Sequence, residues 1–438
     1  MSRTRPSPDT LWARLAAARH QSEALCASLE IEDYGVQALA SGNPPKWHLA
    51  HMAWFLENFL LIPYDREYRV FDRLYHRVFN SGFKTFGQPF DHSKLGTLSR
   101  PTVAQVLQYR AHVGEGLARL RSEAERPENT RLIEIAEWGV QHEYQHQEMM
   151  LLDIQYNFAQ NPWRPAYRSD LPPLAATGGH PAPMQWLEFP GGDTLLGAPD
   201  PAPGLDKERP AHPVRLAPYA LADRSVTVGE YLDFIEDGGY QRAALWSEEG
   251  WKTRTEKNWE APLYWEKRGT NWEQYTFSGM RTVCCAAPVS HVSFYEAQAY
   301  ARWAGARLPS EAEWENAVRE EIGSEEDEAV KRANLLDSGW FQPVPAAVHE
   351  GYVSPRGLRQ TFGDVWEWTT SDYLPYPDSR TPGGALAEYT GTFMPGEKVL
   401  RGGSCLTPAP AARATYRNFF RAWRREIFAG IRLARDIV

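Results

Sequence analysis

The sequence changes its periodicity at one place, and this change limits the possible folds more than any other feature. Up to about residue 160, apolar residues recur every three or four positions over long segments, as in amphipathic helices. Residues 160–185 are rich in proline and glycine, and the apolar segments beyond them are short and separated by Trp- and Gly-rich stretches. We therefore expect a helical domain over 1–165, a Pro/Gly linker over 166–184 and an α+β domain over 185–438.

Four helices are predicted before the linker. The first follows Asp9, the second runs from Lys46 to near Pro63, the third follows a capping-box pattern at Thr102, and the fourth runs from about Thr130 to Phe158. A long irregular connection, Tyr64 to Pro101, separates the second helix from the third. Four helices with one long crossover predict a four-helix bundle, a scaffold that often builds metal sites from inward-facing side chains.

Composition excludes several classes of protein. The net charge is −9 and no basic tract is present, which argues against nucleic acid as a partner. No apolar run approaches the ~18 residues of a membrane span, and the first residues lack the apolar core of a signal peptide. The four cysteines form no CxxC pair, which fits a reducing compartment. We expect a soluble, cytoplasmic protein.

Two histidines mark the fourth predicted helix. His142 and His146 are four residues apart, so both imidazoles lie on one helix face, one turn apart. Such a pair is either part of a metal site or an ordinary polar face, and the spacing alone does not decide between them. The second helix carries two more histidines, His48 and His51.

Several motifs in the second domain point to one fold. They are Pro288–Ala297, Ala304–Glu315, Gly363–Thr369, Leu400–Ser404 and Gly430–Arg435. Together they resemble the formylglycine-generating (sulfatase-modifying) fold, a C-type-lectin-like α+β domain. Members that generate formylglycine bind copper through two cysteines after the Gly-Gly-Ser segment. Here Cys405 has no second cysteine after it, so we expect no two-thiolate site and a buried, structural Cys405.

The join of a DinB-like four-helix bundle to this domain resembles the EgtB family, the non-haem iron sulfoxide synthases of ergothioneine biosynthesis. The resemblance covers the whole chain and includes Lys46–His51, His142–Glu148 and Tyr416–Phe420. It implies an oxidoreductase that uses Fe(II) and O2. It also implies three iron ligands, His51, His142 and His146. His48 and Glu148 are expected beside the ligands, not among them.

Zinc is the alternative metal, because three histidines and a water also form a catalytic zinc site. That metal would imply hydrolysis by a metal-bound hydroxide.

The acceptor of the family is hercynine, the trimethylated betaine of histidine. A quaternary ammonium group is best held by aromatic faces. Trp366, Phe419 and Phe420 lie in or beside the matched motifs, although core packing explains such residues equally well. By the resemblance, Asn418 contacts the betaine carboxylate and Gln145 hydrogen-bonds the imidazole of hercynine.

The donor side departs from the family pattern. Sulfur-using relatives carry two tyrosines after a Phe-Asn-Ser in the crossover, where this chain has Gly82 and Phe83. Tyr373 and Tyr376 are therefore the candidates for the catalytic proton donor. Arg424 lies near a family arginine that binds the donor carboxylate, and Phe420 stands where the family has a donor-binding acid.

These departures slightly favour the selenoneine synthase (SenA) branch, which would join a selenosugar to C2 of hercynine through a C–Se bond. One alternative is an EgtB-type sulfoxide synthase that forms a C–S bond with cysteine or another thiol. An alternative of another class is a non-catalytic protein that binds a betaine or a sugar.

Overall fold

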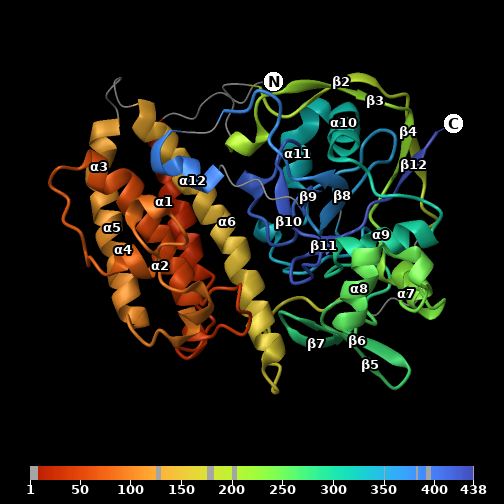
Figure 1. Cartoon of the computed structure of the whole chain (residues 1–438), viewed down its shortest axis with the longest axis horizontal. Helices are drawn as coiled ribbons and strands as arrows, with labels where there is room; N and C mark the ends of the chain where they lie inside the picture. Colours follow the sequence, from red (N-terminus) through yellow and green to blue (C-terminus); the bar gives the residue numbers. More distant parts are fainter. Residues whose placement is uncertain are drawn as a thin grey trace. The chain divides into compact units, whose positions relative to one another are not determined.

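The structure is a computed structural model and describes residues 8–124, 130–174, 182–199, 205–349, 351–380, 383–390 and 396–437. Residues 175–181 of the predicted linker, and the predicted break at 126–129, lie outside the described residues. The chain divides into two compact units (Figure 1). The helical unit comprises residues 2–167 and 381–392, and the second unit comprises 168–380 and 393–438.

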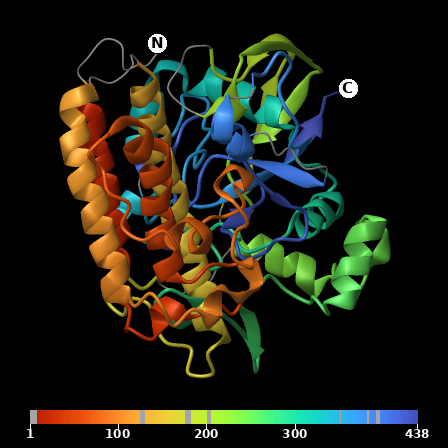
Figure 2. The same cartoon turned by 60° about the vertical axis from the view of Figure 1, so that its left-hand side comes forward.

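The long helices of the helical unit run alongside one another in both views (Figure 1, Figure 2). They are α1 (Pro8–Ala24), α2 (Pro45–Leu56), α5 (Val103–Ala124) and α6 (Thr130–Gln160). α2 packs against α5 and α6, and all 12 of its residues are buried. A helix enclosed in this way is apolar on nearly every side. The few polar side chains of α2, including His48 and His51, therefore face the interior of the bundle.

The predicted capping box starts α5. The backbone N–H of Thr102 donates to Gln105 Oε1 (2.9 Å), and the backbone N–H of Gln105 donates to Thr102 Oγ1 (3.2 Å). These two bonds satisfy N–H groups that the first helical turn leaves without partners. In the part of the chain that the structure describes, no helix is long and apolar enough to cross a membrane.

The crossover between α2 and α5 begins with a π-helical turn, Glu57–Leu61, and α3 (Ile62–Tyr64), and it contains α4 (Tyr75–Val78). The buried Glu57 carboxylate accepts hydrogen bonds from the hydroxyls of Tyr68 and Tyr109, each at 2.7 Å. Buried carboxylates require such partners, so this acid stabilises the packing of the crossover on α5.

One short helix from late in the sequence belongs to the helical unit. This is α12 (Ala387–Thr390). Its Glu388 accepts hydrogen bonds from the backbone N–H groups of Lys84 (2.5 Å) and Thr85 (3.1 Å) in the crossover. The Thr85 hydroxyl donates to the same carboxylate.

The second unit is built on short strands. Its four-stranded sheet has the order β10-β9-β8-β11, antiparallel except for the parallel β8–β11 pair. A three-stranded antiparallel sheet has the order β1-β4-β12, β2 pairs with β3, and β5, β6 and β7 form a meander. The strands are β1 (Trp186–Phe189), β2 (Gly192–Leu196), β3 (His212–Leu216), β4 (Tyr219–Ala222), β5 (Trp265–Arg268), β6 (Asn271–Thr276), β7 (Gly279–Thr282), β8 (Trp366–Asp372), β9 (Glu397–Arg401), β10 (Asn418–Arg421), β11 (Ala429–Gly430) and β12 (Ala434–Asp436).

Helices accompany these sheets. They are α7 (Val228–Glu236), α8 (Glu248–Glu256), α9 (Phe294–Trp303), α10 (Glu311–Glu321) and α11 (Glu326–Lys331). Capping boxes led by Thr227, Ser293 and Ser310 start α7, α9 and α10. Each pairs a hydroxyl with a glutamate three residues later, which sets the first residue of the helix.

The matched motifs of the second unit supply its buried polar core. Glu367 is 1% exposed and accepts hydrogen bonds from Trp314 Nε1 (2.6 Å), Arg432 Nε (2.8 Å) and the Ser225 hydroxyl (2.9 Å). Cys405 is fully buried. A buried carboxylate with one guanidinium and two neutral donors is well compensated, so these motif residues serve packing.

Candidate metal centre

Three imidazoles converge where α2 packs on α6. The candidate ligand nitrogens of His51, His142 and His146 all lie within 4.8 Å of one another. Their ring centroids are 4.9 Å apart for His51 and His142, 4.8 Å for His51 and His146, and 4.4 Å for His142 and His146. α6 supplies two histidines from successive turns and α2 supplies the third. The structure thus brings together the three residues that the sequence predicts as metal ligands.

Aromatic rings hold two of these imidazoles in place. The Trp47 ring stacks on His51 with centroids 4.6 Å apart, and the Phe55 ring stacks on His142 at 4.4 Å. Both aromatic residues lie on α2, one turn from His51 on either side. Flat faces packed on the imidazoles restrict the rotamers of the histidines before any ion binds.

A backbone carbonyl fixes the tautomer of His51. His51 Nδ1 lies 2.6 Å from the carbonyl oxygen of Phe79, in the crossover. A carbonyl only accepts, so Nδ1 carries the proton and Nε2 carries the lone pair. Phe79, which orients this candidate ligand, begins the Phe-Asn-Ser segment, and Gly82 and Phe83, which depart from the family pattern, come directly after that segment.

A second chain of hydrogen bonds orients His146. Its Nδ1 lies 2.9 Å from His48 Nδ1, and His48 Nε2 lies 2.9 Å from Asp153 Oδ2. Asp153 Oδ2 also accepts from the backbone N–H of Asn43 (2.8 Å), so it acts as an acceptor. His48 therefore donates through Nε2 and accepts through Nδ1, which leaves the proton of His146 on Nδ1 and its lone pair on Nε2. His48 thus contacts a candidate ligand and is not itself part of the three-histidine group.

Burial keeps the cluster uncharged. Desolvation, with a smaller effect of neighbouring imidazoles, lowers the pKa of His51 to about 3, although the hydrogen bond to Phe79 raises it. The same two causes lower the pKa values of His142 and His146 well below the usual range. Neutral imidazoles are the form that binds metals.

These residues fit a transition-metal ion. Among the described residues the group contains three imidazoles and no carboxylate. Imidazole donors suit iron and zinc, and two of the three have a partner that turns Nε2 toward the others. Three protein ligands leave open positions for substrates on an octahedral ion, which is the requirement of an oxygenase.

The two other predicted residues of the helical unit lie near these histidines. Gln145 is half-buried and precedes His146 on α6. Phe83 is 4% exposed and packs in an aromatic cluster with Trp54, Phe59 and Phe86. Trp54 in turn lies 5.6 Å from the His51 ring, centroid to centroid. One aromatic ring therefore separates Phe83 from a candidate ligand.

Predicted aromatic residues of the second unit gather around β8 and β10. The Tyr373 and Phe419 rings stack with centroids 3.8 Å apart and planes 9° apart. Trp366 is 2% exposed and lies 5.6 Å from Tyr416, centroid to centroid. Phe419 is only half-buried. Lys207 lies over the Phe419 ring and Arg417 over the Tyr373 ring of this stacked pair, whereas Trp366 packs in the interior.

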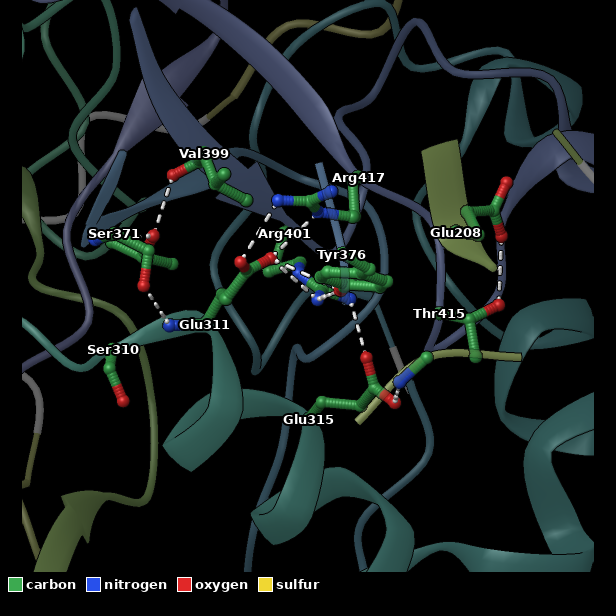
Figure 3. Close-up of polar contacts among 12 residues, drawn as sticks. Glu208, Ser310, Glu311, Glu315, Ser371, Tyr376, Val399, Arg401, Thr415 and Arg417 are labelled. Atoms are coloured by element: carbon green, nitrogen blue, oxygen red, sulfur yellow. Dashed lines mark hydrogen bonds and ion pairs between the residues drawn. The ribbon is translucent and has the colours of Figure 1, made fainter. Parts of the chain in front are cut away.

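The two candidate tyrosines differ in their surroundings. Tyr376 Oη lies 3.1 Å from Arg401 Nη2 and 3.4 Å from Glu311 Oε2, inside a buried ion network (Figure 3). Arg417 extends from the same network over the rings of both tyrosines. Desolvation raises the pKa of both phenols, so both stay protonated at neutral pH. The hydroxyl of Tyr376 is therefore already hydrogen-bonded to Arg401 and Glu311.

The remaining predicted residues lie on β10 and just after it. Asn418 is half-buried, and its Oδ1 accepts from the backbone N–H of Phe419 (3.0 Å). Phe420 is half-buried, with the Arg424 guanidinium 5.8 Å from its ring centroid. Arg424 Nε also lies 3.0 Å from Glu426 Oε2.

Sequence reasoning missed Asp153 and Lys207. Asp153 follows His146 by seven residues, which is two helical turns, so the spacing itself places it on the same face of α6. No pattern in the sequence marks Lys207, because its surroundings come from segments more than 200 residues later.

Family models match both parts of the chain. The DinB superfamily matches residues 14–150, and the sulfatase-modifying factor enzyme 1-like domain matches residues 179–437. The hercynine oxygenase of Mycobacterium tuberculosis is 34% identical over 456 residues, which cover 98% of this chain and 100% of that relative. This chain belongs to the hercynine oxygenase family. The predicted fold, a DinB-like helical bundle followed by an α+β sulfatase-modifying domain, is confirmed.

Other relatives share less of the chain. The hercynine oxygenase of Mycolicibacterium smegmatis is 36% identical over 315 residues, 68% of this chain and 71% of the relative. The formylglycine-generating enzyme of Streptomyces coelicolor is 31% identical over 262 residues, which cover 50% of this chain and 78% of that enzyme. Similarity to the hercynine oxygenase of M. tuberculosis thus extends over both units.

Proposed function

We propose that this chain is an Fe(II)- and O2-dependent enzyme that joins a chalcogen donor to the imidazole C2 of hercynine. The observation that carries this function is the buried cluster of His51, His142 and His146, in a chain similar over its whole length to a hercynine oxygenase. Iron held by these residues would supply the redox chemistry with O2. The protein must then position the reactants and provide a proton.

The chain prepares the ligands before iron binds. The Phe79 carbonyl holds His51 with Nε2 toward the cluster, and His48 with Asp153 does the same for His146. Desolvation keeps all three imidazoles neutral by lowering their pKa values, so no proton has to leave a ligand when the ion binds.

Three side chains are the candidates for holding the acceptor. Gln145, one residue before His146, would hydrogen-bond the imidazole of hercynine. Phe419 would place a ring face against its trimethylammonium group, and Asn418 would contact its carboxylate. The stacking of Tyr373 on Phe419 supports this role, because it fixes the orientation of the Phe419 ring.

Tyr373 is the better candidate for the proton donor. Its phenol is protonated, since burial raises its pKa, and its ring stacks on a residue assigned to the acceptor site. The Tyr376 hydroxyl is bonded to Arg401 and Glu311, which suits a structural role. Tyr373→Phe should lower turnover, whereas Tyr376→Phe should lower thermal stability more than turnover.

The donor is the finer part of the proposal. Phe83 replaces a phenol in the crossover with an apolar ring, and Asn80 Oδ1 holds this turn by accepting from the backbone N–H groups of Gly82 (2.9 Å) and Phe83 (2.7 Å). Selenium is a stronger nucleophile than sulfur and needs less help from the protein. A donor loop without a phenol therefore suits a selenosugar. A thiol donor, giving a C–S bond, is the second candidate and is supported by the hercynine oxygenase relatives.

Product analysis separates these candidates. Enzyme purified without oxygen and loaded with Fe(II) is mixed with hercynine, O2, and either cysteine or a selenosugar, and the products are identified by mass spectrometry. Turnover with the selenosugar far above that with cysteine supports the selenium donor. Comparable turnover with cysteine contradicts it and leaves the sulfoxide synthase. Binding of hercynine without any product supports a non-catalytic binding protein.

A further inference from the structure

A buried lysine lies beside the aromatic residues of the second unit. Lys207 is 8% exposed, and its Nζ lies 4.7 Å from the Tyr416 ring centroid and 5.0 Å from the Phe419 ring centroid. An ammonium group has three N–H donors, and ring faces satisfy them only in part. Within the described residues, Nζ has neither a hydrogen-bond acceptor nor a carboxylate at ion-pair distance.

Two buried acids of this unit, Glu208 and Glu311, are bound to other cations. Glu208 accepts from Arg413 Nε (2.8 Å) and the Thr415 hydroxyl (2.8 Å). Glu311 accepts from Arg417 Nε (2.9 Å) and Nη2 (3.0 Å), and from Arg401 Nη2 (2.9 Å) (Figure 3). Guanidinium groups thus take up these carboxylates and leave Lys207 without one. Asp206, the preceding residue, attracts the ammonium only at longer range.

Lys207 offers an ammonium, which attracts anions, beside an aromatic stack. Tyr373 stacks on the Phe419 ring, Lys207 lies over the Phe419 ring, and Arg417 lies over the Tyr373 ring. The carboxylate of a small molecule therefore matches Lys207. A buried cation gains more from an incoming carboxylate than an exposed one, because water screens the pair less.

We propose that Lys207 is a binding residue for the carboxylate of a small zwitterionic substrate. This inference rests on the proposed function, in which hercynine is such a substrate and a cysteine donor, the second candidate, would be another. Hercynine is a betaine with a carboxylate, and a cysteine donor is an amino acid. The shared chemistry is a carboxylate on a cationic molecule, and binding measurements distinguish the two sources.

The charge of Lys207 responds to its neighbours. Desolvation above all, together with Arg413 and Arg417, lowers the pKa of Lys207 to about 7, although Glu208 and Asp206 raise it. A bound carboxylate would favour the protonated amine. Affinity for the carboxylate ligand is therefore expected to fall as the pH rises above 7, and this fall should be absent in Lys207→Met.

Binding to full-length, Fe(II)-loaded enzyme under argon tests the assignment. Calorimetry compares hercynine with its decarboxylated analogue, and cysteine with cysteamine, for the wild type, Lys207→Met and Lys207→Arg. Lys207→Met should weaken binding of one carboxylate ligand by about 10- to 100-fold and leave its decarboxylated partner unchanged. Lys207→Arg should retain most of the affinity. Lys267→Met is the matched control, because Lys267 lies over the Trp272 ring but is exposed.

Each outcome has one meaning. A loss confined to hercynine assigns Lys207 to the acceptor, and a loss confined to cysteine assigns it to the donor. Unchanged binding of all four ligands, or an equal loss for all four, overturns the assignment. Hercynine-dependent O2 uptake by the wild type is measured in parallel. If that uptake is present and Lys207→Met binds normally, only the lysine assignment fails; if it is absent, the proposed function fails first.

Discussion

His51 and His146 are held by different partners, and the difference predicts how each responds to mutation. The Phe79 carbonyl that orients His51 belongs to the backbone, so no side-chain substitution removes it directly. The partner of His146 is the His48 side chain, which Asp153 orients in turn. The hydrogen bonds from Asp153 to His48 and from His48 to His146 can therefore be removed one at a time by single substitutions.

Removing these hydrogen bonds should weaken metal binding without unfolding the protein. His48→Phe fills the same space but offers no acceptor to His146, so affinity for Fe(II) should fall by about 10- to 100-fold. Asp153→Asn should have a smaller effect, because an amide oxygen still accepts from His48. Competition with a coloured chelator measures the affinity, and circular dichroism checks folding. Unchanged affinity in a folded His48→Phe variant would show that His48 does not orient the ligand.

At this scale the three clustered histidines were predictable from the sequence as candidate ligands, and their environment was predictable only in part. The spacing of His142 and His146 indicates one helix face, but only the resemblance to a family added His51. Asp153 was overlooked although it lies on the same helix face, because a single acid seven residues from a histidine is common on helices. Contacts such as that of His51 with Phe79 depend on a crossover with no regular pattern.

At the scale of elements, the crossover and α12 form a unit that sequence position does not reveal. Glu388 binds Lys84 and Thr85 across 304 and 303 residues, so no local pattern encodes the contact. The helices and the Thr102 capping box were predictable, because periodicity and caps are local signals. The π-helical turn at Glu57–Leu61, where Glu57 accepts hydrogen bonds from Tyr68 and Tyr109, was not predicted by any local pattern.

Removing the Glu388 carboxylate should loosen the crossover without affecting the metal centre. Glu388→Ala leaves the N–H groups of Lys84 and Thr85 without this acceptor, so hydrogen exchange of a peptide covering them should accelerate. Fe(II) affinity should stay at the wild-type value, because the carboxylate contacts none of the three histidines. Glu115→Ala, at an exposed acid on α5, is the control. Unchanged exchange in Glu388→Ala would mean that the crossover is held by its own contacts.

At the scale of the whole molecule, binding residues reduce stability where they bury unpaired charge. Lys207 is the clearest case, because burial lowers its pKa from 10.5 to about 7. Between these values the unfolded chain binds more protons than the folded one, so the free energy of unfolding rises with pH across this window. Below pH 7 the penalty of the buried charge is complete.

Lys207→Met should remove this dependence. Relative to the wild type, the variant should be more stable at pH 7, by on the order of 2 kcal/mol, and the difference should shrink toward pH 10. Urea unfolding of both proteins at several pH values, monitored by tryptophan fluorescence, measures the difference. A variant that is less stable than the wild type at pH 7 would show that the ammonium is compensated in the folded protein.

The two-part organisation of the molecule was predictable, because a change in periodicity and a Pro/Gly-rich stretch are visible without a structure. The roles of individual motif residues were not. Glu367 and Arg432 lie in motifs that indicate the fold, and they form a buried ion pair. The distinction between Tyr373 and Tyr376 likewise depends on Glu311 and Arg401, which come from other parts of the chain.

Oxygen uptake by the Fe(II)-loaded, full-length enzyme tests the central claim most directly. With donor present, uptake should depend on hercynine, should disappear in His51→Ala, and should be retained in His20→Ala, which changes an exposed histidine of α1. Zinc-loaded enzyme should consume no oxygen. Hercynine-independent uptake, or full activity in His51→Ala, would contradict an iron-dependent oxygenase that acts on hercynine through these three histidines.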